Sequence, residues 1–311
     1  MRAFIFPGQG SQAVGMGRAL AEASAIARAV FQEVDAALGQ HLFRLMTGGS
    51  KEELELTENA QPAIMANAIA TLRVLEQEGG MRLADKADYV AGHSLGEYSA
   101  LCAAGAIDLP TTARLLKHRG LAMQAAVPVG VGAMAVLLGT DLAQARAIAE
   151  AAADDEVCAV ANDNDPSQVV LSGHRGAIER AVALAKEMGA KRAILLPVSA
   201  AFHCSLMQPA ADAMEKALEE ARIDAPLVPL FANVTAAPVA DADTIRRLLV
   251  EQVTGIVRWR ESVLAMQGAG VERFVEFGGK VLTPMVRRIA PDAAATNVVT
   301  MDDVEALVQV L

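Results

Sequence analysis

The feature that most constrains this sequence is the stretch YVAGHSLGEY at residues 89–98, which predicts a strand, a sharp turn and a helix with Ser94 at the apex. The pattern is G-x-S-x-G, typical of a nucleophile elbow, because bulk at Gly92 or Gly96 would clash in so tight a turn. Ser94 would then lie at the N-terminus of a helix over 95–104, where free N–H groups can hold a developing oxyanion. The alternative is a serine that only caps a helix in an ordinary α/β loop.

Composition narrows the class of protein. A chain of 311 residues is long enough for a large domain that carries a smaller one. Hydrophobic residues make up 53% of the chain and aromatic residues only 4%, which favours a helix-rich α/β protein with close packing of helices on a sheet. The formal net charge of −10 argues against nucleic-acid binding, because phosphate backbones would repel such a chain.

The sequence gives no signal for export, a membrane or a bound metal. The three cysteines, Cys102, Cys158 and Cys204, are scattered among apolar residues, so neither a disulfide framework nor a metal site is predicted. The apolar run at 3–6 is too short for a signal peptide, and no later run reaches membrane-spanning length. We therefore expect a soluble cytoplasmic protein with no membrane contact.

A Gly/Pro-rich stretch at 127–132 marks a change in the order of the predicted elements. From there the sequence predicts a strand, a helix, two strands joined by a polar loop, a helix and a strand, at 133–138, 142–152, 157–161, 168–172, 176–188 and 192–197, with the loop at 162–166. This β-α-β-β-α-β order is typical of a ferredoxin-like unit. Because an α/β pattern resumes afterwards, we predict a small ferredoxin-like domain over 128–197. It would be inserted into an α/β-hydrolase-like catalytic domain of residues 1–127 and 198–311 with a mostly parallel sheet.

The loop after the first predicted strand, at 2–6, contains Gly8, Gly10 and Ala13 at the G-x-G-x-x-A spacing of a dinucleotide-binding loop. That motif needs a second strand with an acidic end about 20 residues further on. Here the pattern stays helical as far as Glu78, so dinucleotide binding is not favoured.

A nucleophilic serine needs a base, and His203 is the best placed of the five histidines. It lies downstream in an apolar strand-to-loop context, whereas His93 flanks the serine, where neighbouring side chains diverge. A buried structural histidine is an open alternative. Arg119 lies in a stretch rich in alanine, leucine and methionine, where a partly buried guanidinium could grip an anionic substrate. A surface arginine with a buried stem is the alternative for this residue.

Read together, six segments resemble the malonyl-CoA:acyl-carrier-protein transacylases. They occur in the order found in that family and span nearly the whole chain, which makes chance agreement an inadequate explanation. The segments are FPGQGSQ at 6–12, GHSLGEY at 92–98, RG at 119–120, FH at 202–203, NVT at 233–235 and EQV at 251–253.

The resemblance implies a role for each matching residue. Ser94 would be the nucleophile that accepts the acyl group, and His203 its general base. The backbone N–H groups of Gln9 and Leu95 would form the oxyanion hole. Arg119 would pair with the free carboxylate of the malonyl group.

Two further residues take roles from the same resemblance. The main-chain carbonyl of Gln252 would orient the histidine, so a triad aspartate is not expected. Phe202 matches the malonyl-selecting versions of related domains. The implied function is transfer of malonyl from malonyl-CoA to acyl carrier protein in fatty acid biosynthesis, without a metal or redox cofactor. Nothing in the sequence suggests a large apolar interface, so we expect a monomer. The segment EFGGK at 276–280 departs from the family, which usually has a proline between the glycines, and this departure could shift the helix predicted from Thr283.

Two other functions stay open at this point. A serine hydrolase, either an esterase or a patatin-like lipase, would share the elbow but would need no anion clamp. A non-catalytic scaffold that binds carrier protein would be expected to have lost Ser94 or His203, and both are present.

Overall fold

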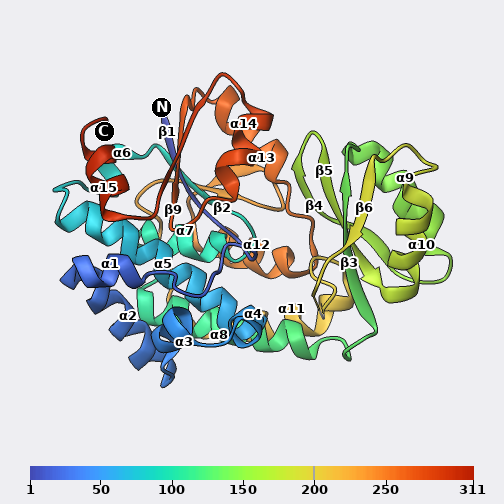
Figure 1. Ribbon diagram of the computed structural model, residues 1–311, viewed down its shortest axis with the longest axis horizontal. Coiled ribbons are helices and arrows are strands. Elements are labelled where there is room, and N and C mark those ends of the chain that lie inside the picture. Colours follow the sequence, from blue (N-terminus) through green and yellow to red (C-terminus); the bar gives the residue numbers. More distant parts are fainter. Residues whose placement is uncertain (199) are drawn as a thin grey trace.

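The structure, a computed structural model, describes residues 1–198 and 200–311; Ser199, which falls within the predicted catalytic domain, lies outside the described residues. Its strands form two separate sheets (Figure 1). The larger has the order β10-β9-β1-β2-β7-β8, and every pair in it is parallel except β7 with β8. These strands are β1 (Arg2–Phe6), β2 (Tyr89–Gly92), β7 (Leu230–Ala232), β8 (Ala237–Val239), β9 (Arg273–Phe277) and β10 (Ala294–Val298). The protein is therefore a mixed α/β protein with a mostly parallel main sheet.

Helices cover both faces of this sheet. Before the small sheet the chain forms α1 (Arg18–Ala23), α2 (Ala25–Leu38), α3 (Leu42–Gly48), α4 (Lys51–Glu55), α5 (Thr57–Gln77), α6 (Leu83–Lys86), α7 (Gly96–Ala103) and α8 (Leu109–Ala125). After it come the 3-10 turn η1 (Ser205–Met207), α11 (Gln208–Glu220), α12 (Ala242–Thr254), α13 (Trp259–Gly268), α14 (Leu282–Ile289) and α15 (Met301–Val308). No helix among the described residues is both long and apolar enough to cross a membrane.

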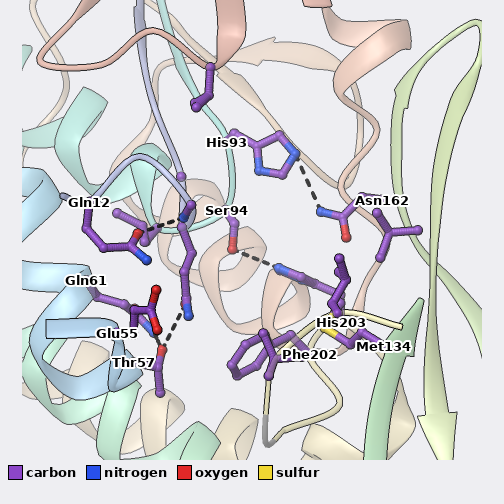
Figure 2. Close-up of a pocket in the computed structure, with 18 of the residues that line it drawn as sticks. Gln12, Glu55, Thr57, Gln61, His93, Ser94, Met134, Asn162, Phe202 and His203 are labelled. Atoms are coloured by element: carbon purple, nitrogen blue, oxygen red, sulfur yellow. Dashed lines mark hydrogen bonds between the residues drawn. The ribbon is translucent and has the colours of Figure 1, made fainter. Parts of the chain in front are cut away.

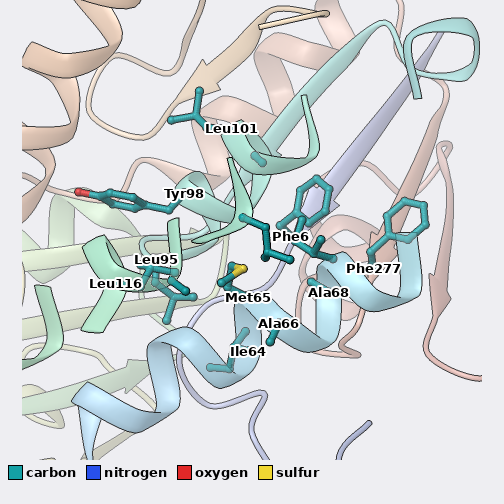
Figure 3. Close-up of a cluster of buried hydrophobic side chains, with 14 of the residues drawn as sticks. Phe6, Ile64, Met65, Ala66, Ala68, Leu95, Tyr98, Leu101, Leu116 and Phe277 are labelled. Atoms are coloured by element: carbon teal, nitrogen blue, oxygen red, sulfur yellow. The ribbon is translucent and has the colours of Figure 1, made fainter. Parts of the chain in front are cut away.

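The central strand β1 shows why both faces are covered. Its side chains alternate, so that Phe4 and Phe6 lie in one apolar cluster while Ala3 and Ile5 lie in another. The first cluster includes the long helix α5, and Figure 3 shows its residues beside Phe6. The second cluster is closed by residues of α13 and α14. Burial on both faces is what a parallel sheet requires.

The second sheet has the order β4-β5-β3-β6, and all its pairs are antiparallel. Its elements are β3 (Gly132–Leu138), α9 (Leu142–Ala153), β4 (Cys158–Asp165), β5 (Gln168–His174), α10 (Arg175–Ala185) and β6 (Arg192–Leu195). Both helices lie on the face turned away from the rest of the molecule (Figure 1). The order of elements predicted from the sequence is confirmed.

The predicted polar loop at 162–166 is wrong, because β4 continues through Asp165 and its last four side chains are buried. Two of those side chains find charged partners across the boundary between the sheets. Asp163 lies 2.8 Å from Arg260 of α13, and Asp165 lies 2.7 Å from Arg288 of α14. Asn162 also forms a β-bridge with Val257. These contacts tie the small sheet to the helices that cover the main sheet.

The elbow between β2 and α7 is as tight as the sequence predicts. A Cβ atom on Gly92 would lie 1.9 Å from the carbonyl carbon and oxygen of Gly96, and one on Gly96 would lie 2.2 Å from the Phe6 carbonyl oxygen. Ser94 between them has a φ of 55°, a left-handed conformation that a residue with a side chain rarely adopts. Sterics alone therefore explain both glycines.

We expect Gly92→Ala to lower the free energy of unfolding by about 1–3 kcal/mol or more, the usual cost of overpacking, since all three clashing atoms belong to the backbone. Gly268→Ala is the matched control, because its Cβ would meet nothing within 4 Å and the site is helical. That change should be neutral or stabilising by up to about 1 kcal/mol. Urea denaturation measures both; equal stability of the two variants would contradict this account of the elbow.

Candidate active site

A cavity of about 860 Å³ lies between the two sheets, and Ser94 and His203 are both in its wall. Figure 2 shows the two side chains pointing toward one another, with Met134 of the small sheet and Phe202 nearby. The cavity also reaches the loop after β1 and the first residues of α5. Ser94, His203, Gln9, Leu95, Arg119 and Phe202 therefore all line one cavity, whereas Gln252 is not in its wall.

Ser94 and His203 form a hydrogen-bonded pair, with 2.7 Å between Oγ and Nε2. The other ring nitrogen, Nδ1, lies 2.9 Å from the carbonyl oxygen of Gln252 and 3.2 Å from that of Gly255. Because a carbonyl can only accept, Nδ1 must carry the proton, which leaves Nε2 free to accept from the serine. The described residues place no carboxylate on this histidine, as expected for a dyad.

His203 is held in the neutral state that a base requires. Burial, and secondarily the charge of Arg119, lower the pKa of its imidazole to about 3. Its backbone φ is 58°, so the serine and the histidine are both held in the left-handed region.

Asn233 holds the elbow in place. Its side-chain oxygen accepts from the backbone N–H of Ser94 at 2.8 Å, and its side-chain nitrogen donates to the carbonyl of Gly92 at 2.7 Å. These bonds satisfy two backbone groups that the sharp turn leaves without a ladder partner. The sequence analysis used Asn233 only as part of a motif and gave it no role.

Arg119 is the most unusual charge in the structure, since its side chain is only 1% exposed and none of the ion pairs among residues 1–198 and 200–311 includes it. Its Nη2 lies 3.2 Å from Ser94 Oγ and 2.9 Å from Gln252 Oε1, and its Nη1 lies 2.8 Å from Gln61 Oε1. Burial lowers the pKa of the guanidinium. The surface alternative for this residue is wrong.

The backbone explains how this arginine reaches the site. A Cβ on Gly120 would lie 2.4 Å from the Cα of Glu58, so only glycine lets α8 approach α5 this closely. The approach brings Arg119 beside Gln61 of α5. Gln61 had no sequence signal of its own, because its role depends on this crossing of two helices.

The remaining predicted residues also lie at the cavity. Gln9, Leu95 and Phe202 are all in its wall. The side chain of Gln9 accepts from Thr57, which fixes the loop after β1, and Leu95 immediately precedes α7, whose first N–H groups have no acceptor within the helix. His93 turns away from the dyad, with Nε2 2.8 Å from Asn164 Oδ1, as predicted for a residue next to the nucleophile.

Comparisons with known proteins agree with this site. The model of the acyl transferase domain family matches residues 3–281. The malonyl CoA-acyl carrier protein transacylase of Escherichia coli K12 is 46% identical over 295 residues, which cover 94% of each chain. The crystal structure of the acyl-carrier-protein S-malonyltransferase of Bartonella henselae is 52% identical, with a TM-score of 0.97 over 99% of this chain and 98% of that one. This chain belongs to the malonyl CoA-acyl carrier protein transacylase family. It is an acyltransferase.

Another solved structure similar to this transacylase contains a carrier protein. It is a malonyl-transacylase in complex with its type II PKS acyl-carrier protein, 39% identical to this chain with a TM-score of 0.96, over 100% of this chain and 99% of that one.

The turn at 276–280, which lacks the proline expected for this family, leads directly into α14. Glu276 accepts from the backbone N–H groups of Val281, Leu282 and Thr283 at 2.8–3.0 Å and from the hydroxyl of Thr283. A buried carboxylate therefore caps the helix, which starts at Leu282, one residue earlier than predicted.

The depressed pKa of His203 makes a direct prediction. Its ring resonances should show no titration between pH 5 and 8, because the neutral form is lost only as the pH falls toward about 3. In Arg119→Ala, loss of the neighbouring charge should raise this pKa. NMR of the assigned histidine ring measures both; titration of the wild-type ring near 6.5 would contradict the burial argument.

Proposed function

We propose that this chain transfers the malonyl group of malonyl-CoA to the phosphopantetheine thiol of acyl carrier protein, through a malonyl-Ser94 intermediate in fatty acid biosynthesis. The observation that supports this best is a buried guanidinium, with no carboxylate partner in the described part of the chain, 3.2 Å from the nucleophile of a serine–histidine pair. An unpaired buried cation is costly, so the site favours a substrate that brings an anion with it.

The first half-reaction acylates Ser94. His203 Nε2 takes the hydroxyl proton as Oγ attacks the thioester carbonyl, and the carbonyl oxygen becomes an oxyanion facing the N–H groups of Gln9 and Leu95. One such donor lowers the barrier by about 2.7–4 kcal/mol. The intermediate collapses by breaking the C–S bond, and His203 gives its proton to the departing CoA thiolate.

The second half-reaction runs in reverse with a different thiol. His203 takes the proton of the phosphopantetheine thiol, the sulfur attacks the malonyl ester, and the C–O bond to Ser94 breaks. The proton returns from His203 to Ser94 Oγ. Throughout, the carbonyl of Gln252 keeps the proton on Nδ1 and so keeps Nε2 available.

Arg119 acts on the choice of substrate. Its fork would pair with the malonyl carboxylate, and a hydrogen bond to a charged group contributes about 1.5–3 kcal/mol. An acetyl group would leave the buried guanidinium without an anion. We assign Phe202 to the wall beside the acyl group, where its ring would disfavour a branched chain such as methylmalonyl.

We further propose that the chain divides into a catalytic domain of residues 1–127 and 198–311 and a small domain of residues 128–197. The elbow at the carboxyl end of β2 and the parallel strands around it support an α/β-hydrolase-like description of the first. The β-α-β-β-α-β order in an antiparallel sheet supports a ferredoxin-like description of the second. Monomeric state, cytoplasmic location and independence from metal or redox cofactors stay predictions from the sequence.

The serine hydrolase alternative is less well supported. It accounts for the dyad but gives no use for a buried arginine that contacts the nucleophile. The scaffold alternative gives no use for the 2.7 Å contact between Ser94 and His203.

We expect the wild-type protein mixed with malonyl-CoA to gain the mass of one malonyl group, and Ser94→Ala to gain none. Intact-mass spectrometry measures this directly, and release of the adduct by carrier protein with its phosphopantetheine thiol tests the second half-reaction. A wild-type protein that stays unmodified would refute the proposal. An adduct removed equally fast by water alone would favour the hydrolase.

Arg119→Ala should lower the ratio of kcat/KM for malonyl-CoA to that for acetyl-CoA by roughly 10- to 100-fold, the equivalent of one charge-assisted hydrogen bond. Competition between the two thioesters, read as the two adduct masses, gives the ratio in one experiment. Arg114→Ala, on the exposed side of the same helix, is the control and should leave the ratio unchanged. A ratio unaffected by Arg119→Ala would remove this residue from substrate selection.

A further inference from the structure

Glu97 is a buried carboxyl group that the mechanism above does not use. It is the second residue of α7, three positions after the nucleophile, and is 1% exposed. Burial raises the pKa of this carboxyl to about 8. The side chain of Gln252 donates to it, and the backbone of Asn233 also donates toward it. It therefore accepts from two residues that already contact the catalytic pair.

The contacts of Gln252 show what this carboxyl determines. The side-chain nitrogen of Gln252 faces three acceptors: Glu97, the backbone carbonyl of Ser94 at 2.9 Å and the side-chain oxygen of Asn233 at 3.3 Å. Its side-chain oxygen has one hydrogen-bond partner among residues 1–198 and 200–311, Arg119, whose Nη2 lies 2.9 Å away. Turning the amide over would set oxygen against oxygen at one end and N–H against guanidinium at the other.

Arg119 in turn has few contacts that fix its position. Two amide oxygens, from Gln61 and Gln252, hold the guanidinium beside Ser94 Oγ, and its carbon lies 5.7 Å from the centre of the Tyr98 ring. Without the oxygen of Gln252, Nη2 would keep only its 3.2 Å contact with the nucleophile. The direction of the Gln252 amide is thus one of two supports for the substrate clamp.

We propose that Glu97 is a positioning residue for malonyl selection: by accepting from Gln252, it turns the amide oxygen of Gln252 toward Arg119 and so holds the guanidinium where the malonyl carboxylate arrives. The inference rests on the proposed function, since it concerns how that substrate is chosen. Gln252 then orients both partners of Ser94, His203 through its main-chain carbonyl and Arg119 through its side chain.

The role is that of an acceptor and not of a counter-ion, because no ion pair joins Glu97 to Arg119 among the described residues. A glutamine at position 97 offers an oxygen at the same place, so Glu97→Gln should keep most of the selectivity. Glu97→Met keeps the length of the side chain but offers no comparable acceptor. The two variants separate hydrogen bonding from the filling of space.

The test is the malonyl-to-acetyl ratio of kcat/KM, measured by thioester competition on the full-length protein. We expect Glu97→Met to lower this ratio roughly 10-fold and Glu97→Gln to change it less than about 3-fold. In the Arg119→Ala background, Glu97→Met should have no further effect on the ratio, because the group it positions is absent. A loss of stability alone would lower both rates together and leave the ratio where it was.

A wild-type ratio in Glu97→Met would overturn this inference, and so would an equal loss in Glu97→Gln and Glu97→Met. If Glu97→Met does not fold, Gln252→Met tests the contact through which Glu97 would act, since it removes the amide oxygen from Arg119 and leaves the main-chain carbonyl on His203. A wild-type protein that forms no malonyl adduct would remove the proposed function and this inference with it. If the wild-type protein prefers malonyl and Glu97→Met or Gln252→Met leaves that preference intact, the inference fails but the proposed function stands.

Discussion

The close approach of backbone to backbone at the elbow is the constraint on which the rest of the site depends. Gly92, Gly96 and the carbonyl of Phe6 lie so near one another that β1, β2 and α7 are locked together, and Ser94 is forced to a positive φ. Such a strained residue persists only where its surroundings hold it. Asn233 supplies that hold by bonding to the backbone on both sides of the turn. Because the elbow is rigid, Ser94 Oγ has a fixed position at which His203 and Arg119 both contact it.

Electrostatics then set the states of the groups around Ser94. Burial, aided by the nearby charge of Arg119, keeps the imidazole of His203 neutral, which suits a base. Arg119 itself is buried and has no carboxylate partner among the described residues, which suits a clamp for an acid. The same arginine therefore serves both steps of the chemistry that we propose. Among the described residues, its hydrogen-bond partners are the oxygens of two amides and of the nucleophile, beside the Tyr98 ring, so an incoming carboxylate meets no carboxylate already bonded to the guanidinium.

Residues of both sheets are required to form the cavity. The nucleophile comes from the main sheet, whereas Met134, Val136 and Val170 of the small sheet form part of the opposite wall. Ion pairs from the buried aspartates of β4 to partly exposed arginines of α13 and α14 keep the small sheet in place. This explains why a strand ends in four polar residues that look like a loop. Their partners lie 97 and 123 residues further along the chain, where no local pattern could reveal them.

The sequence by itself determined what depends on neighbours along the chain. The elbow follows from steric rules within ten residues, and the order of strands and helices follows from hydrophobic periodicity, with ends shifted by a few residues and the short strands β8 and β10 missed. For His203 and Arg119 the residues alone left structural alternatives open, and only resemblance to a family assigned them roles.

Tertiary structure decided the rest, because burial and pairing are properties of groups brought together in space. In the folded chain Gly120 lets α8 and α5 pack closely, and Asp163 pairs with Arg260. Glu97 accepts from the Gln252 amide there, the contact that we propose orients the amide toward Arg119. The elbow at Ser94 depends on ten neighbouring residues, whereas the substrate choice that we propose depends on side chains from four separate helices.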